Sequence, residues 1–418
     1  MDIKNFIFSK TEEKKHTVIK ILGVKFKFRN GRWETKIKRK EKKYDVGIIS
    51  LNMHSVTYNF GAALHSFAFQ QYLDKCNISN VIINYYPETV RLNFITEKIL
   101  SDFREKDFSN LKQNLIYGMY VLQKKIKFDK FFKKYCKVTK YRYELDTLPQ
   151  LKSINRFVCE TDITWAKFKI GGYDRGFLCD LPNMKKKDNV AYSIDFGYGK
   201  LTGKNATFLK KYAKNFKYIS VRNILKIEEF KSAIEREDVV VTIDPVFLLG
   251  VEDYKKIAKK PRIKEEYLLV YNCADNNLEM RTKAIEFAQQ KNLKVIEINS
   301  YSRNVIDFKD SLPTPIGIEE FLGLILNCRY LFTNSYHGIC FGIIFNKDFY
   351  VFSRIFESEK LFVLMELFSL KDRFIKDNEQ VIEQKIDYNY VNQKLKLLIK
   401  DSENFIYKSI IANKNFDR

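Results

Sequence analysis

The sequence has few histidines and few of the residues that break or cross-link a chain. Its 418 residues include 4 His, 7 Pro, 16 Gly and 7 Cys. So little Gly and Pro excludes fibrous and low-complexity classes. No two cysteines have CxxC spacing, which disfavours zinc knuckles and thioredoxin-type sites. An odd number of thiols without that spacing is typical of free, buried cysteines in a reducing compartment.

Long apolar runs are missing as well. No stretch approaches the roughly 20 apolar residues that cross a bilayer. Charges at Lys10, Glu12 and Glu13 disfavour a secretory signal at the start of the chain. Hydrophobic residues make up 45% and aromatic residues 15%, which is typical of a folded protein. We therefore expect a cytoplasmic protein with about two domains.

Positive charge is in excess and unevenly distributed. The formal net charge is +23, a field that attracts nucleic acid, anionic lipid or phosphorylated substrates. Residues 17–43 hold eleven Lys or Arg and two Glu. This segment predicts a small hairpin with Gly23 at its turn, followed by a basic strap. The strap either makes peripheral contact with an anionic membrane surface or is simply solvated, and the sequence leaves both interpretations open.

A first α/β alternation follows this extension. A β-branched run at 46–51, a helical face at 60–73 and a run at 81–85 predict the opening of a parallel, doubly wound sheet. Residues 90–145 have a helical pattern. Further predicted strands are 156–159, 190–194, 217–221 and 238–243, and further predicted helices are 205–215 and 227–235.

A second alternation begins after a charged segment at 250–264 that Pro261 interrupts. Its predicted strands are 267–271, 293–298, 330–333 and 348–352, its predicted helices are 277–290, 317–326 and 337–345, and a helical tail covers 382–411. The predicted fold is α/β, with Rossmann-like domains at 44–255 and 256–376 facing a cleft. A basic extension at 1–43 and a helical tail at 377–418 complete the chain. Ligands of such sheets bind beyond the carboxyl ends of the strands.

Two residues at predicted strand ends could do chemistry. His337 lies in Thr333-Asn-Ser-Tyr-His-Gly338, where a strand turns into a helix, so it could act as a general acid or base beside a helix N-terminus. An ordinary capping turn fits the same position. Arg222 follows strand 217–221 directly and could bind a carboxylate or phosphate with its guanidinium fork, or form an ion pair.

Other candidates lie at similar positions. His54, Asn59 and Gly61 follow the first strand, where Asn59 can cap a helix and Gly61 permits a close approach. Asp244 and Arg354 also come just after predicted strands. His65, one turn into the helix, suits a structural role. The sequence has no HExxH, Walker A, GxSxG or DxD motif, so we predict no metal.

These motifs resemble the polysaccharide pyruvyl transferase family from about Asp45 to Phe374. Asn59-Phe-Gly-Ala-Ala-Leu64 is similar to the family's N-[YF]-G-A-x-L-Q, with His65 in place of Gln. Glu160-Thr-Asp-Ile-Thr-Trp165 resembles G-S-D-Q-x-W, where Asp162 and Trp165 match and Glu160 replaces Gly. Thr333-Asn-Ser-Tyr-His-Gly338 is similar to T-D-S-F-H-G, with Asn334 in place of Asp.

The resemblance implies a GT-B-like enzyme that moves the pyruvyl group of phosphoenolpyruvate onto a sugar of a cell-envelope or exopolysaccharide precursor, forming a pyruvate ketal. Phosphoenolpyruvate would be a co-substrate and no cofactor would be needed. By this resemblance His337 is catalytic, and Arg222, Ser335 and Gly338 bind the small anionic donor. The acceptor, a sugar or a lipid-linked oligosaccharide, would lie near His54, Asn59, Gly61, Asp162, Asp244 and Arg354.

Two other functions stay open. A GT-B glycosyltransferase with a nucleotide-sugar donor would use the same cleft, and Glu160 would then hold a ribose or sugar hydroxyl. Nucleic-acid binding through the basic, aromatic segment 104–143 has the weakest support, because no recognised module is present. We therefore expect no nucleic-acid partner.

Overall fold

The structure is a computed structural model in which the chain forms two compact units, Met1–Lys42 and Lys43–Arg418. The residues it describes are 8–13, 16–21, 24–29, 42–52, 54, 58–87, 111–167, 172–185, 187–197, 201–273, 277–299, 315–354, 358–376, 379–381 and 383–412.

The first unit contains an antiparallel sheet with the order β1-β2-β3. Strands β2 (His16–Ile21) and β3 (Val24–Arg29) form the predicted hairpin, in which His16 lies opposite Arg29. Strand β1 (Phe8–Glu13) was not predicted. Its sequence, FSKTEE, has one β-branched residue and little strand signal of its own, so its strand conformation depends on pairing with β2.

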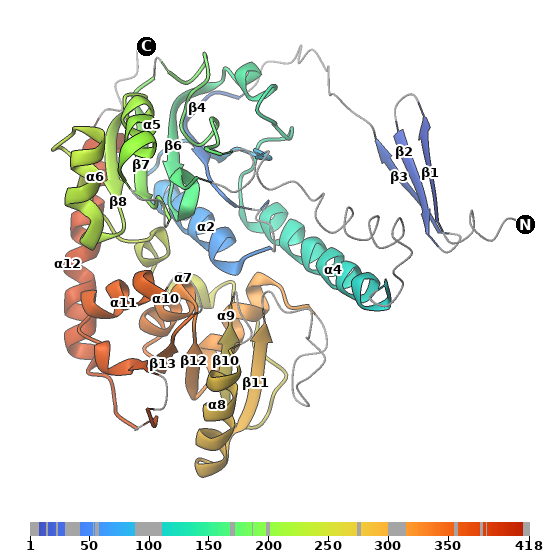
Figure 1. The fold of residues 1–418 in the computed structure, drawn as a ribbon, viewed down its shortest axis with the longest axis vertical. Helices are drawn as coiled ribbons and strands as arrows, with labels where there is room; N and C mark the ends of the chain where they lie inside the picture. Colours follow the sequence, from blue (N-terminus) through green and yellow to red (C-terminus); the bar gives the residue numbers. More distant parts are fainter. Residues whose placement is uncertain are drawn as a thin grey trace, which may run out of the picture. The chain divides into compact units, whose positions relative to one another are not determined.

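The second unit begins with a six-stranded parallel sheet, whose order is β5-β4-β6-β7-β8-β9 (Figure 1). Strand β5 lies on one side of β4, and β6 and the later strands lie on its other side. This change of side puts a topological switch point between β4 and β6. The strands are β4 (Tyr44–Ile49), β5 (Asn80–Ile82), β6 (Ile154–Glu160), β7 (Asn189–Ile194), β8 (Phe216–Val221) and β9 (Val240–Val241).

A five-stranded parallel sheet follows, with the order β11-β10-β12-β13-β14. Its switch point lies between β10 and β12. The strands are β10 (Tyr267–Asn272), β11 (Lys294–Asn299), β12 (Tyr330–Thr333), β13 (Asp348–Phe352) and β14 (Phe374–Ile375). These two sheets confirm the predicted class of two Rossmann-like α/β domains.

Helices separate most of the strands, as parallel sheets require, although between β6 and β7 the described residues contain only a 3-10 turn. Those of the first domain are α2 (Phe60–Lys75), α4 (Leu111–Tyr135), α5 (Gly203–Ala213) and α6 (Ile227–Ile234). The others are α7 (Val251–Lys255), α8 (Leu278–Gln290), α9 (Ile318–Asn327), α10 (Tyr336–Ile344), α11 (Ser358–Leu367) and α12 (Tyr388–Ile406). Two short 3-10 turns matter for the site, η3 (Asp162–Trp165) and η5 (Pro245–Leu248).

One hydrophobic core joins the two domains. The ring of Phe60, at the start of α2, stacks on Phe321 of α9 with centroids 4.4 Å apart. Helix α12 returns to the first sheet (Figure 1). Its Ser402 accepts a hydrogen bond from the backbone N–H of Ile243, and just after the helix the carbonyl of Ser409 accepts one from Arg156. The helical tail therefore packs against the first domain after the chain has completed the second.

Three predicted elements differ from the structure. The predicted strand 238–243 shrinks to β9, and just beyond it the N–H of Ile243 is bound by Ser402 of the tail. The helical pattern at 90–145 yields α4 only. Residues 88–110 lie outside the described residues, and after Tyr135 the chain is extended, with Tyr143 bridged to Tyr85. The tail helix begins at Tyr388, where Asp387 caps it.

Candidate active site

The two switch points face each other, and their loops meet. Beyond β4 lies the N-terminus of α2, and beyond β12 lies the N-terminus of α10. Asn59 caps α2 as predicted, by accepting a hydrogen bond from the N–H of Gly61 at 2.8 Å. A Cβ atom on Gly61 would lie 1.9 Å from Nδ1 of His337, so only glycine allows this approach of helix to imidazole. The contact brings His337 to the edge of the first sheet.

The imidazole of His337 lies where the N-termini of α2 and α10 come together. Its side chain is 8% exposed, and Nε2 has no hydrogen-bond partner among the described residues. That atom lies 3.6 Å from Oδ2 of Asp244, a residue of the first domain. A buried imidazole whose second nitrogen faces a carboxylate is suited to receive or give a proton.

The turn before His337 is held by its own side chains. Ser335 caps α10 by accepting a hydrogen bond from the N–H of Gly338 at 3.3 Å. In this structure the two residues predicted to bind the donor therefore form the helix cap. A Cβ atom on Gly338 would lie 2.3 Å from Oγ1 of Thr333. Arg354, at the end of β13, donates from Nε to the carbonyl of Asn334. Arg354 therefore supports the turn that presents His337.

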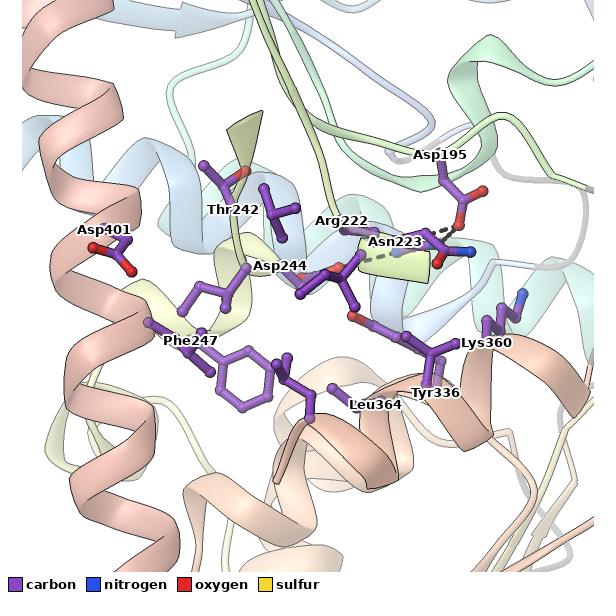
Figure 2. A pocket seen from close by; sticks show the side chains of 16 residues that line it. Asp195, Arg222, Asn223, Thr242, Asp244, Phe247, Tyr336, Lys360, Leu364 and Asp401 are labelled. Atoms are coloured by element: carbon purple, nitrogen blue, oxygen red, sulfur yellow. Dashed lines mark hydrogen bonds and ion pairs between the residues drawn. The ribbon is translucent and has the colours of Figure 1, made fainter. Parts of the chain in front are cut away.

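Arg222 lies in a cluster of three carboxylates. Nε and Nη2 donate to Oδ2 of Asp195 at 3.0 and 2.9 Å, and Nη1 donates to Oδ2 of Asp244 at 3.1 Å (Figure 2). Nη2 also lies 3.6 Å from Oδ1 of Asp162. The guanidinium stacks 4.5 Å from the ring of Tyr336. Most of the guanidinium N–H groups that were predicted to bind a ligand are thus bound to carboxylates of the chain itself. These ion pairs are buried and not on the surface.

The cation keeps its carboxylates ionised. Burial raises the pKa of Asp162, but Arg222, His65 and His337 outweigh it, so the net pKa of Asp162 is lowered. Asp244 is fully buried, which raises its pKa, yet His337 and Arg222 lower the pKa well below its usual value. Asp162 and Asp244 are therefore ionised near neutral pH, and together they outweigh the single positive charge of Arg222.

Glu160 is not available to a ligand. Its side chain is fully buried, and it accepts hydrogen bonds from Ser66 and from Nδ1 of His65, the latter at 2.9 Å. The hypothesis that Glu160 holds a ribose or sugar hydroxyl is therefore wrong, because both carboxylate oxygens are already bound inside the first domain. His65 is fully buried as well, which fits the structural role expected of it.

His54 has a separate environment. Its Nε2 lies 2.6 Å from Oδ1 of Asn84, and its ring packs edge-on against Tyr86 at 5.0 Å. Burial lowers the pKa of His54 to about 4, so this imidazole is neutral near pH 7. Its contacts tie the loop after β4 to the end of β5 and show no link to the Arg222 cluster.

A cavity opens beside the cluster. Asp195, Arg222 and Tyr336 line one side with Lys360, and α12 contributes Asp401 at the far end (Figure 2). The floor between them is apolar and comes from both domains: Val241, Ile243, Phe247, Val363, Leu364, Leu367 and Leu398. The space can therefore take a ligand with a polar end near Arg222 and an uncharged body.

Sequence reasoning missed several residues here. Asp195, Tyr336 and Lys360 were not singled out, although Asp195 directly follows the predicted strand 190–194, which was a usable signal. Lys360 lies on α11, and only packing brings this helix to the cavity. Among the described residues, no group of three or more His, Cys, Asp or Glu has metal-binding geometry. No helix in the described part of the chain is long and apolar enough to cross a membrane.

Solved structures to which the chain is similar include two UDP-GlcNAc 2-epimerases. The Methanocaldococcus jannaschii enzyme is 12% identical, with a TM-score of 0.43 over 85% of this chain and 92% of that one. The Neisseria meningitidis enzyme, solved with UDP-GlcNAc, is 10% identical, with a TM-score of 0.42 over 87% and 93%. The wall teichoic acid polymerase TagF is 10% identical, with a TM-score of 0.37 over 88% and 84%. At these levels the similarities do not bear on the activity of this chain.

No curated protein matches the sequence. The family model for polysaccharide pyruvyl transferase matches residues 59–354. That range begins at the cap of α2, ends at Arg354 and contains every residue of the cluster around Arg222 and His337. The chain belongs to the polysaccharide pyruvyl transferase family.

Proposed function

We propose that this protein transfers the pyruvyl group of phosphoenolpyruvate to two hydroxyls of a sugar in a cell-envelope or exopolysaccharide precursor. The observation that carries the proposal is the buried Nε2 of His337, which lacks a hydrogen-bond partner among the described residues and lies 3.6 Å from Asp244. Family membership supports a transferase of this kind.

The reaction needs an acid, a base and an environment that tolerates a cation. Protonation of C3 of phosphoenolpyruvate leaves positive charge at C2. One sugar hydroxyl attacks C2, and a second forms the other C–O bond as the bond from C2 to the phosphate oxygen breaks. One hydroxyl proton replaces the proton given to C3, and the other leaves with phosphate. His337 is the group we assign to this proton transfer.

The acidic cluster suits the cationic stage. Carboxylates that stay ionised in a buried site stabilise developing positive charge, because the local dielectric is low and they need not reorient. Asp162 and Asp244 meet this condition, since the pKa of each is lowered. They can also accept hydrogen bonds from sugar hydroxyls.

The donor needs positive charge as well. An arginine has five N–H groups; three of those on Arg222 donate to Asp195 and Asp244, which leaves two for a ligand. Lys360 adds a second cation at the edge of the cavity. We assign the phosphate and carboxylate of phosphoenolpyruvate to these two residues, with Ser335 and Gly338 forming the cap of α10 that carries His337.

The acceptor would occupy the rest of the cavity. Its apolar floor fits a sugar ring or the first part of a lipid carrier better than a second charged group. A lipid-linked precursor at the inner face of the cytoplasmic membrane would agree with the basic extension, which we propose as the peripheral membrane contact.

The test is ligand binding by the purified protein. We expect phosphoenolpyruvate to raise the unfolding temperature, since a ligand at 100 times its dissociation constant stabilises by roughly 2.7 kcal/mol. His337→Ala should fold and bind the donor, but release no phosphate from it with sugar acceptors that the wild type uses. Stabilisation by nucleotide-sugars alone would instead identify a glycosyltransferase and reject pyruvyl transfer.

A further inference from the structure

Two positions at which this chain departs from the pattern of the family contact each other. His65 stands where the pattern has Gln, and Glu160 stands where it has Gly. His65 comes from α2 and Glu160 from the end of β6, yet Nδ1 of His65 lies 2.9 and 3.0 Å from the two carboxylate oxygens. Both side chains are fully buried. One departure thus introduces a charge, and the other introduces the group that offsets it.

The other ring nitrogen of His65 faces the candidate active site. Nε2 is buried without a hydrogen-bond partner among the described residues, and it lies 4.0 Å from Oδ2 of Asp162. The ring of His337 is 6.1 Å away, centroid to centroid. Because Glu160 holds Nδ1, the ring can present only Nε2 to the cluster. A protonated imidazole donates from both nitrogens, so it would connect Glu160 with Asp162.

The charges around His65 favour that protonated form. Glu160 faces it from β6, Asp162 from η3, Asp244 from the start of η5 and His337 from α10. Burial lowers the pKa of His65, but Glu160, Asp162 and Asp244 outweigh it and raise the pKa above its usual value. Burial raises the pKa of Glu160 by more than the contacts with His65 and Ser66 lower it. Within the pair, Glu160 raises the pKa of His65 and His65 lowers that of Glu160, so each residue favours the charged form of the other.

We propose that His65, held by Glu160 as an imidazolium, is a positioning residue that fixes the Asp162 carboxylate beside Arg222. The inference rests on the proposed function, because it assigns Asp162 to the reaction site. Asp162 has a left-handed backbone, with φ 57°. Its Oδ1 accepts a hydrogen bond from the N–H of Ile163 at 3.0 Å and lies 3.6 Å from Nη2 of Arg222, whereas His65 lies on the side of Oδ2. Without the imidazolium, Oδ2 would lose this cation, and the carboxylate could turn about its Oδ1 contacts.

The first test needs no ligand. The chain has four histidines, so the ring signals can be followed individually by NMR against pH and assigned with single variants. We expect the His65 ring of the wild type to stay protonated above the pH at which an unperturbed histidine loses its proton. In Glu160→Gln its midpoint should fall. A His65 ring that is neutral at pH 6, or one that Glu160→Gln leaves unchanged, would overturn the proposal.

The second test measures phosphoenolpyruvate affinity against pH in His65→Gln, Glu160→Gln and the double variant. His65→Gln should bind about tenfold more weakly, the effect of losing one positive charge near the site at an intermediate dielectric. Glu160→Gln should have a similar effect, because it leaves the His65 ring neutral. The double variant should lose no more than either single one, because the two residues act as a pair. Wild-type affinity and an unchanged pH profile in His65→Gln would reject the positioning role.

The matched control is Glu297→Gln. Glu297 forms a buried ion pair with Arg281 at 2.9 Å within the second domain, away from the cluster. Its variant should lose stability without changing the pH profile of donor binding, which separates positioning from general destabilisation. If the wild type does not bind phosphoenolpyruvate, the positioning role falls with the proposed function, while the NMR titration still decides whether the imidazolium pair exists.

Discussion

A single methyl group should separate folding from activity in this protein. In Gly61→Ala, the new Cβ would lie 1.9 Å from Nδ1 of His337, whereas ordinary contact begins at 3.4 Å. The imidazole must therefore move by about 1.5 Å, which takes Nε2 out of its place beside Asp244. A misplacement of about 1 Å in a catalytic group can lower the rate by about 100-fold.

The change in stability should be moderate. Overpacking a core costs about 1–3 kcal/mol. Alanine is about 1 kcal/mol better than glycine in a helix interior, but Gly61 lies in the first turn of α2, where this gain is smaller. We therefore expect a loss of about 1–3 kcal/mol in the free energy of unfolding.

The assay is phosphate release from phosphoenolpyruvate with a panel of oligosaccharide acceptors, with thermal unfolding measured in parallel. Gly250→Ala is the control, because a Cβ there meets nothing within 4 Å. If Gly61→Ala keeps the wild-type rate, the position of His337 does not control the reaction. If activity and stability collapse together, the methyl group acts through folding, and the reasoning is equally refuted.

Other predictions concern charge. Arg222→Lys should weaken phosphoenolpyruvate binding about tenfold in calorimetry, because a lysine cannot bridge Asp195 and Asp244 and also offer donors to a ligand. Lys124 is buried, which lowers its pKa to about 7. Between pH 7 and the usual pKa of a lysine, the unfolded chain therefore binds more protons than the folded one. The free energy of unfolding should rise with pH over this range. Lys124→Met should flatten that rise in denaturant titrations; an unchanged slope would assign it to other groups. Deleting residues 1–43 should abolish pelleting with anionic vesicles but spare donor binding, and pelleting of the truncated protein would place the membrane contact elsewhere.

The pattern of the sequence predicted most of the alternation of strands and helices, although α7, α11 and β14 were not predicted. Parallel strands buried on both faces are continuous apolar runs, and the runs before Asp195, Arg222 and His337 are of this kind. Carboxyl ends of parallel strands carry functional side chains, so Arg222, Asp244 and His337 could be chosen from position alone. The weak strands were less predictable, because β1 has little strand pattern of its own, and β1 and β9 depend on pairing with β2 and β8, respectively.

The partners of those side chains were decided by tertiary structure. Sequence cannot show that Arg222 is surrounded by carboxylates, since Asp162 and Asp195 follow other strands and Asp244 follows β9. Nor can it show that the departures at His65 and Glu160 form one pair, because 95 positions separate them along the chain. Local pattern fixes which residues reach the edge of a sheet. Distances and charges between them depend on how the sheets twist and pack, and these long-range contacts leave no local signal in the chain.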